Sequence, residues 1–260
     1  MIHNNDPPIS HWANRQLADY DARQPGSIFA EGAELTLEQG YAVQTAVTEL
    51  RMRRGEQVIG YKVGCTSDKI RTQLGIQHCV SGRLFSSEQH PSGAVLKRST
   101  FARLAIEGEL AVELSRSPTV NDLDAVGVPA CVSRVFPVIE LHHLVMHGLR
   151  PTAGELVANN ALQAGVVTSQ GGMSAAPRAT ELKIFIDDRL VDQCAGKVIV
   201  QTIQSSLRWL HGIMQDRGET LRRGQIILTG SVPSLIPIDQ NCCVRVDAAS
   251  LGVVEALFTT

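Results

Sequence analysis

The sequence predicts an α+β fold in which a helical N-terminal arm, residues 1–55, precedes a β-rich domain, residues 56–260, within one structural unit. Three observations support this prediction. Helical periodicity fills the first quarter of the chain, short β-branched segments dominate after residue 56, and no repeat, low-complexity tract or long linker separates the two parts. A chain of 260 residues, 43% of them hydrophobic, is long enough to bury one large core.

The helices are predicted from caps and apolar faces. Thr36, followed three residues later by Gln39, has the spacing of a capping box, so we expect a helix over residues 37–54. Residues 10–24 predict a shorter helix before it. Residues 201–217 predict an amphipathic helix near the end of the chain.

Strands are predicted from short apolar runs bounded by turn-forming residues. They are expected over residues 58–64, 106–114, 134–142, 163–168, 181–187, 225–230, 242–247 and 252–258. The pair Asp187-Asp188 is expected to form the turn of a hairpin. Ser67 is expected to cap a brief helix that ends near Leu74.

Composition argues against several classes of partner. A net charge of -2 and few aromatic residues give no electrostatic footprint for nucleic acid, and no apolar run reaches transmembrane length. The N-terminus has no secretory signal, so we expect a cytoplasmic protein with six reduced, mostly buried cysteines. The one tight basic cluster, Arg51, Arg53 and Arg54, ends a predicted helix, where cations complement the helix dipole.

Three glutamates are the strongest candidates for metal ligands. Glu107 and Glu109 are two residues apart in a predicted strand, so their carboxylates point to the same face and repel each other unless a cation lies between them. Glu140, in an apolar run, would complete an all-oxygen shell, which suits Mg²⁺ or Mn²⁺ and leaves positions for a chelating substrate. The alternative is that Glu107 and Glu109 line the solvated face of an antiparallel strand and that Glu140 is half-exposed.

Lys62 and three histidines are further candidates. Lys62 lies in a short strand between glycines and could move protons near a bound substrate, although an edge-strand lysine is the alternative. His143 and His147 would share a face at spacing i, i+4 if they were helical, and the cluster with His142 could bind zinc, contact substrate or simply pack.

Four segments occur in the order and spacing of one known family. They are Gly-Tyr-Lys-Val-Gly-Cys-Thr-Ser (60–67), Glu-Gly-Glu (107–109), Val-Ile-Glu-Leu (138–141) and Ile-Ile-Leu-Thr-Gly-Ser (226–231). With them the chain resembles, over nearly its whole length, the hydratase and decarboxylase branch of the fumarylacetoacetate hydrolase superfamily. This branch includes 2-oxopent-4-enoate hydratase and 4-oxalocrotonate decarboxylase.

The resemblance implies a β-rich roll, usually oligomeric, around a Mg²⁺ (or Mn²⁺) site. It implies that the metal ligands are Glu107, Glu109 and Glu140, that Lys62 is the catalytic lysine, and that Gly230 and Ser231 lie beside the substrate. The implied activity is that of a lyase on a small unsaturated 2-oxo acid, whose carboxylate and keto oxygen chelate the ion so that an enolate is stabilised.

The chain departs from the hydratase pattern at two places where that pattern has aspartates. It has Val80 in place of the first and Asn159 in place of the second. Two proton-handling carboxylates of the hydratases are thus replaced by neutral residues. The resemblance implies that an apolar residue at position 80 is closer to the decarboxylases, so decarboxylation is slightly favoured over water addition. Asn159 and His143 remain candidates for substrate contact, with a helix-surface amide as the alternative for Asn159.

Other functions stay open. The same fold and metal could serve an acylpyruvate hydrolase or an isomerase, and a non-catalytic partner subunit is a third possibility. We expect a small-molecule 2-oxo acid as substrate, no nucleic-acid or membrane partner, and a homo-oligomer that can associate with a pathway enzyme.

Overall fold

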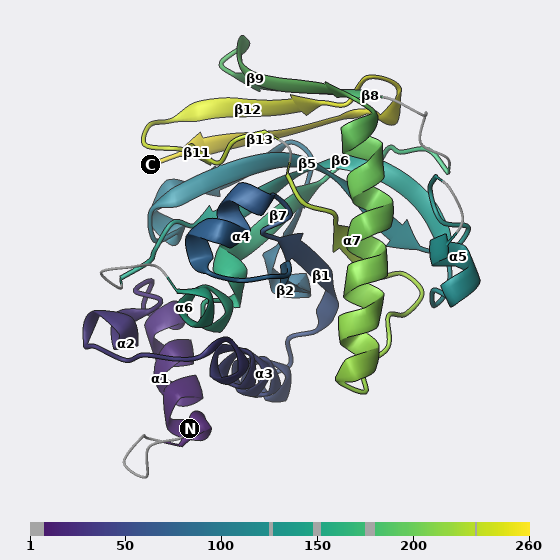
Figure 1. The fold of residues 1–260 in the computed structure, drawn as a ribbon. Helices are drawn as coiled ribbons and strands as arrows, with labels where there is room; N and C mark the ends of the chain where they lie inside the picture. The colour runs from purple at the N-terminus through teal and green to yellow at the C-terminus, as the bar shows by residue number, and fades with distance from the viewer. Residues whose placement is uncertain (1–7, 125–126, 148–151, 175–179, 232) are drawn as a thin grey trace.

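Two sheets and seven α-helices make up the part of the chain that the structure describes (Figure 1). This computed structural model describes residues 8–260 except 125–126, 148–151, 175–179 and 232. The helices are α1 (Ile9–Asp21), α2 (Ser27–Ala30), α3 (Leu37–Arg53), α4 (Asp68–Leu74), α5 (Val120–Asp124), α6 (Ala153–Ala158) and α7 (Lys197–Asp216). None of the described helices is long and apolar enough to cross a membrane.

The larger sheet has eight strands and curls strongly. Its order is β2 (Val80–Phe85), β1 (Val58–Gly64), β10 (Ile226–Leu228), β5 (Leu104–Leu114), β6 (Val132–His143), β7 (Gln163–Thr168) and β3 (Gln89–Pro91), and β11 (Ile236–Pro237) pairs with β5. Although β2 and β7 are far apart in this order, they contact each other across the curl. The sheet therefore has a concave face on which side chains from distant strands can meet.

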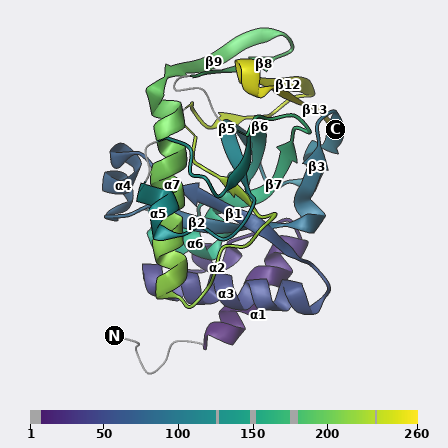
Figure 2. The same ribbon diagram turned by 90° about the vertical axis from the view of Figure 1, so that its right-hand side faces the viewer.

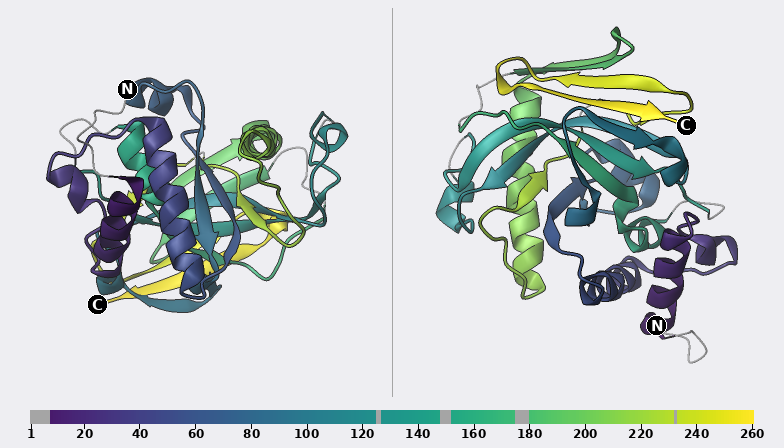
Figure 3. Two further views of the ribbon diagram at one scale, coloured as in Figure 1. Left: turned by 90° about the horizontal axis from the view of Figure 1, so that it is seen from below. Right: turned by 180° about the vertical axis from the view of Figure 1, so that it is seen from behind.

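The smaller sheet lies over the convex face of the larger one (Figures 1 and 3). Its order is β4 (Ala94–Lys97), β13 (Val253–Thr259), β12 (Cys242–Asp247), β8 (Thr180–Ile186) and β9 (Arg189–Gly196). The long helix α7 runs along one side of both sheets (Figure 2). Together these elements fit the predicted α+β roll with helices at its N-terminus.

Alternation along β5 decides which residues form the core and which face the site. Ile106, Leu110 and Val112 are buried in the main hydrophobic cluster with residues of the smaller sheet and of α7. Glu107 and Glu109 point to the opposite, concave face because successive side chains of a strand alternate. A Cβ on Gly108 would lie 2.9 Å from the Ile184 side chain, so a glycine lets the two sheets approach closely here.

The helical arm, α1 to α3, is fixed to the larger sheet by buried polar contacts. Gln44 of α3 donates hydrogen bonds to Ser81 O at 2.9 Å and to Val157 O at 3.1 Å. Its Oε1 accepts a hydrogen bond from Arg83 at 2.8 Å. Because every polar atom of this buried amide is used, the arm is held against β2 and α6.

Most predicted elements are present with shifted ends. The capping box of Thr36 and Gln39 is confirmed at the start of α3, and the hairpin turn has positive φ at Asp187 and Asp188. The strand predicted over 225–230 is shorter, because β10 ends at Leu228. The expectation of mostly buried cysteines is wrong in part: Cys131 and Cys242 are buried, Cys243 is exposed, and the other three cysteines are partly exposed.

Candidate metal centre

The three predicted ligands meet on the concave face of the larger sheet. Glu107 of β5 stands directly opposite Glu140 of β6, and Glu109 follows two residues later on the same face. Glu109 and Glu140 are each 1% exposed. Like charges this close and this deeply buried destabilise a sheet unless cations neutralise them, so the alternative of solvated surface glutamates does not fit Glu109 or Glu140.

Lys62 reaches the same place from β1. Its Nζ lies 2.9 Å from Glu140 Oε1 and donates a hydrogen bond to Ala161 O at 3.0 Å. Lys62 is buried inside the sheet and pairs with both neighbouring strands, so the alternative of an exposed edge-strand lysine is wrong. Burial disfavours its charge, but Glu140 and then Glu107 outweigh burial and raise the pKa of Lys62.

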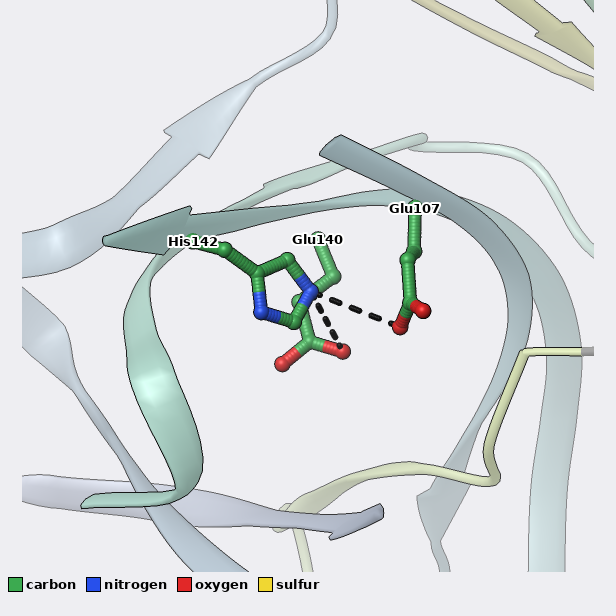
Figure 4. Close-up of side chains that lie close together, drawn as sticks. All are labelled: Glu107, Glu140 and His142. Carbon is green, nitrogen blue, oxygen red and sulfur yellow. Dashed lines mark ion pairs between the residues drawn. The ribbon is translucent and has the colours of Figure 1, made fainter. Parts of the chain in front are cut away.

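His142, a candidate for zinc binding or substrate contact together with His143 and His147, joins this cluster of glutamates. Its Nε2 lies 3.4 Å from Glu107 Oε2 and 3.5 Å from Glu140 Oε2, and Figure 4 shows the three side chains pointing toward one another. The ligand atoms of these three residues all lie within 4.8 Å of one another. The sequence carried a signal for this position, because His142 is two residues after Glu140 and therefore shares its face.

The pKa values of the two buried glutamates, Glu109 and Glu140, are displaced in opposite directions. Burial, reinforced by the charge of Glu140, raises the pKa of Glu109 well above its usual value. Burial acts in the same direction on Glu140, but Lys62 and His142 outweigh it and lower the pKa of Glu140. Two buried carboxylates with pKa values displaced in opposite directions are typical of a functional site.

Unsatisfied polar atoms show that this donor set fits a cation. Glu109 Oε1 and both ring nitrogens of His142 are buried without a hydrogen-bond partner among the described residues. Buried polar atoms of native proteins are rarely left in this state. Carboxylate oxygens and an imidazole nitrogen that converge on one point are the ligands that a divalent ion takes.

Gly230 and Ser231 border the cluster from the end of β10. The Gly230 N–H donates a hydrogen bond to Glu109 Oε2 at 2.5 Å. Gly230 has a φ of 96°, and a Cβ there would lie 2.5 Å from the Thr66 side chain, so other residues would be strained. Ser231 Oγ lies 2.9 Å from Pro233 O and 3.3 Å from Gly108 O. Their contact with a substrate stays a prediction.

The remaining two predicted site residues, Asn159 and His143, line a cavity next to the helical arm. Asn159 is buried; its Oδ1 accepts a hydrogen bond from Gln16 at 2.5 Å, and its Nδ2 donates one to Glu155 O at 3.1 Å. It is therefore not a helix-surface amide, and its atoms join α1 to α6. Substrate contact by Asn159 stays a prediction.

His143 ends β6 and faces away from the glutamates. Its Nδ1 accepts a hydrogen bond from Ala102 N at 3.0 Å, and burial lowers its pKa to about 4. His147 is not helical either, so a shared helical face for His143 and His147 is wrong. His143, Asn159 and the helical arm line a separate cavity that does not include the glutamates. Whether substrate reaches His143 stays a prediction.

Val80 lies beside the lysine, at the position that departs from the hydratase pattern. Val80 is fully buried on β2 and packs against Val157 and Ala161. Its Cγ2 and the Lys62 Nζ lie 3.5 and 3.7 Å from the point where a Cβ of Gly64 would stand. Val80 and the end of the Lys62 side chain therefore both border Gly64.

Comparison with solved structures identifies the class of fold. The chain superimposes on 4-oxalocrotonate decarboxylase from Pseudomonas putida G7, complexed with magnesium and adipate, with a TM-score of 0.85 at 22% identity, covering 96% of this chain and 97% of that one. It also matches fumarylpyruvate hydrolase from Pseudomonas aeruginosa, in complex with Mn²⁺ and pyruvate, with a TM-score of 0.60 at 12% identity, covering 76% and 88%. The chain therefore shares the fold of these two enzymes, as the predicted roll required.

Curated relatives of this chain include decarboxylases and hydratases. The chain is 26% identical to 4-oxalocrotonate decarboxylase from Pseudomonas putida over 95% of this chain and 94% of the relative. It is 25% identical to 2-keto-4-pentenoate hydratase from Burkholderia vietnamiensis over 88% and 87%. No family model matches. The predicted resemblance to the hydratase and decarboxylase branch is confirmed. A cytoplasmic location and a homo-oligomer stay predictions.

Proposed function

We propose that this protein is a lyase, dependent on Mg²⁺ or Mn²⁺, that acts on a small unsaturated 2-oxo acid, with decarboxylation favoured over hydration. The observation that carries the proposal is the convergence of Glu107, Glu109 and Glu140 with Lys62 on one buried face. Relatives named as decarboxylases and hydratases support the lyase class, and solved neighbours that hold magnesium or manganese support the metal.

The chain supplies the groups that such a reaction needs. A divalent ion held by Glu107, Glu109 and Glu140 would bind the 2-oxo acid head and stabilise the enolate charge. The Gly230 N–H holds the Glu109 carboxylate in a fixed orientation. Lys62, in contact with Glu140, is the group that can give a proton to the dienolate carbon after the bond to the departing carboxylate breaks.

Val80 supports decarboxylation over hydration. Water addition needs a group that takes a proton from the attacking water, whereas loss of CO₂ needs an electron sink and a final proton donor. The apolar Val80 beside Lys62 offers no carboxylate for the first task. Hydrolysis and isomerisation have no comparable supporting feature among the described residues.

Product analysis tests the proposal. Purified protein with Mg²⁺ is incubated with 4-oxalocrotonate and, separately, with 2-hydroxypenta-2,4-dienoate, and the products are followed by mass spectrometry. We expect loss of CO₂ from the first compound, and no reaction for a Glu140→Gln variant. Water gain by the second without CO₂ loss from the first would identify a hydratase instead. No reaction with either compound would contradict the lyase proposal.

A further inference from the structure

His142 occupies a position that the three-glutamate description of the site does not explain. It is 4% exposed, and its Nε2 is the atom nearest to the carboxylates of both Glu107 and Glu140 in Figure 4. Neither ring nitrogen has a hydrogen bond within the described part of the chain. The adjacent His143, on the opposite face, does accept one from Ala102 N. The Nε2 of His142 therefore faces the two carboxylates at distances longer than those of a good hydrogen bond, and a shared ion would give all three groups a partner.

The distances suit coordination of one ion. Two ligand atoms bound to the same ion at about 2.1 Å each are at most about 4.2 Å apart. His142 Nε2 is 3.4 and 3.5 Å from the nearer oxygens of Glu107 and Glu140, inside that limit. All three ligand atoms lie within 4.8 Å of one another, so a small side-chain rotation is sufficient to place them around one ion.

The surrounding carboxylates also favour a cation at this place. The carboxylates of Glu107, Glu109 and Glu140 face one lysine, Lys62. A divalent cation among them relieves the repulsion between the carboxylates and gives the His142 ring nitrogen a partner.

We infer that His142 is a fourth protein ligand of the metal centre, and that the centre therefore binds transition metals such as Mn²⁺, Fe²⁺ and Co²⁺ in preference to Mg²⁺. Imidazole nitrogen strengthens binding of transition ions but adds little for Mg²⁺, which prefers oxygen. Four protein ligands leave two positions of an octahedron, the number that a chelating 2-oxo acid requires. The inference rests on the proposed metal site but not on the reaction that it serves.

Pulsed electron paramagnetic resonance of the Mn²⁺-loaded protein tests the inference directly. With histidine labelled by ¹⁵N, the wild-type protein should show a nitrogen coupling that changes from ¹⁴N to ¹⁵N. The coupling should vanish in His142→Ala and persist in His78→Ala, whose side chain is exposed. Bound Mn²⁺ without histidine coupling would overturn the inference and leave the glutamate site intact. Absence of any bound Mn²⁺ would overturn both.

Metal selectivity gives a second readout. Calorimetric titration of metal-free protein should show that His142→Ala weakens Co²⁺ binding about 10- to 100-fold, while Mg²⁺ binding changes by less than about threefold. His78→Ala should change neither affinity. Equal losses for Co²⁺ and Mg²⁺, or no loss for Co²⁺, would overturn the assignment of His142 as a ligand. The wild-type resonance spectrum decides the question even if the variant fails to fold.

Discussion

Lys62 Nζ and Glu140 Oε1 lie 2.9 Å apart although their strands, β1 and β6, are separated by two others in the sheet. The contact is possible because the sheet curls and both side chains point to its concave face. It places the cation of Lys62 beside carboxylates that lie 45 or more residues later in the chain. The proposed chemistry depends on this ion pair.

Removing the charge of Lys62 should lower the stability of the metal-free protein. In Lys62→Met, Glu140 loses its buried cation, which should cost about 3–5 kcal/mol of unfolding free energy in metal-free protein. Urea unfolding in EDTA measures this loss. Lys183→Met is the matched control, because Lys183 pairs with Glu181 near the surface and should cost at most about 1 kcal/mol. Equal losses in the two variants would contradict a buried ion pair.

Removing the charge of Glu109 should lower the affinity for the metal without lowering the stability of the metal-free protein. Burial and Glu140 raise the pKa of Glu109, so the neutral amide of Glu109→Gln relieves a cost in metal-free protein. We expect a Mn²⁺ affinity at least tenfold lower by calorimetry and an unfolding free energy in EDTA that does not fall. Glu113→Gln, on the same strand but paired with Arg134, should keep wild-type affinity. Wild-type affinity in Glu109→Gln would exclude this residue as a ligand.

A carboxylate beside the lysine should change the product. Val80→Asp introduces the aspartate that the resemblance implies for hydratases, and we expect the ratio of water addition to CO₂ loss to rise. Val80→Asn has a similar shape without the charge and controls for the disturbed packing. Mass spectrometry of the two product classes measures the ratio. If both variants kept the wild-type ratio, Val80 would not determine the reaction.

Glu56 should make stability depend on pH in acid. Burial opposes its charge, but hydrogen bonds from Arg51, Ser87 and Arg54 lower its pKa from 4.5 to about 2. Because the folded pKa is the lower one, its contribution is complete above 4.5 and is lost as the pH falls toward 2. The stability difference between wild type and Glu56→Gln, measured by urea unfolding, should therefore be smaller at pH 3 than at pH 6. An identical difference at both values would contradict this assignment.

Local patterns predicted much of the fold and part of the site. The capping box at Thr36 and the two-residue spacing of Glu107 and Glu109 depend on neighbours in sequence, so their geometry follows from strand and helix periodicity. The opposition of Glu107 and Glu140 depends on the register of β5 and β6, which local pattern could not supply. The resemblance implied only that both residues bind the metal.

Local sequence patterns could not predict the contacts between segments that are far apart in the chain. Arg51 was expected only to complement a helix dipole, but it is 4% exposed, pairs with Glu56 and Glu88, and lies over the Phe85 ring at 3.6 Å. His142 was a candidate for zinc binding, substrate contact or packing, and its place between Glu107 and Glu140 was not predicted. In both cases the buried environment that gives the side chain its partners forms only when separate elements pack.

Metal binding tests the central claim most directly. Metal-free protein is titrated calorimetrically with Mn²⁺, for the wild type and for Glu140→Gln, whose native carboxylate contacts both Lys62 and His142. The account predicts one ion per chain for the wild type and an affinity at least tenfold lower for the variant. No binding to the wild type, or equal binding to both proteins, would contradict it.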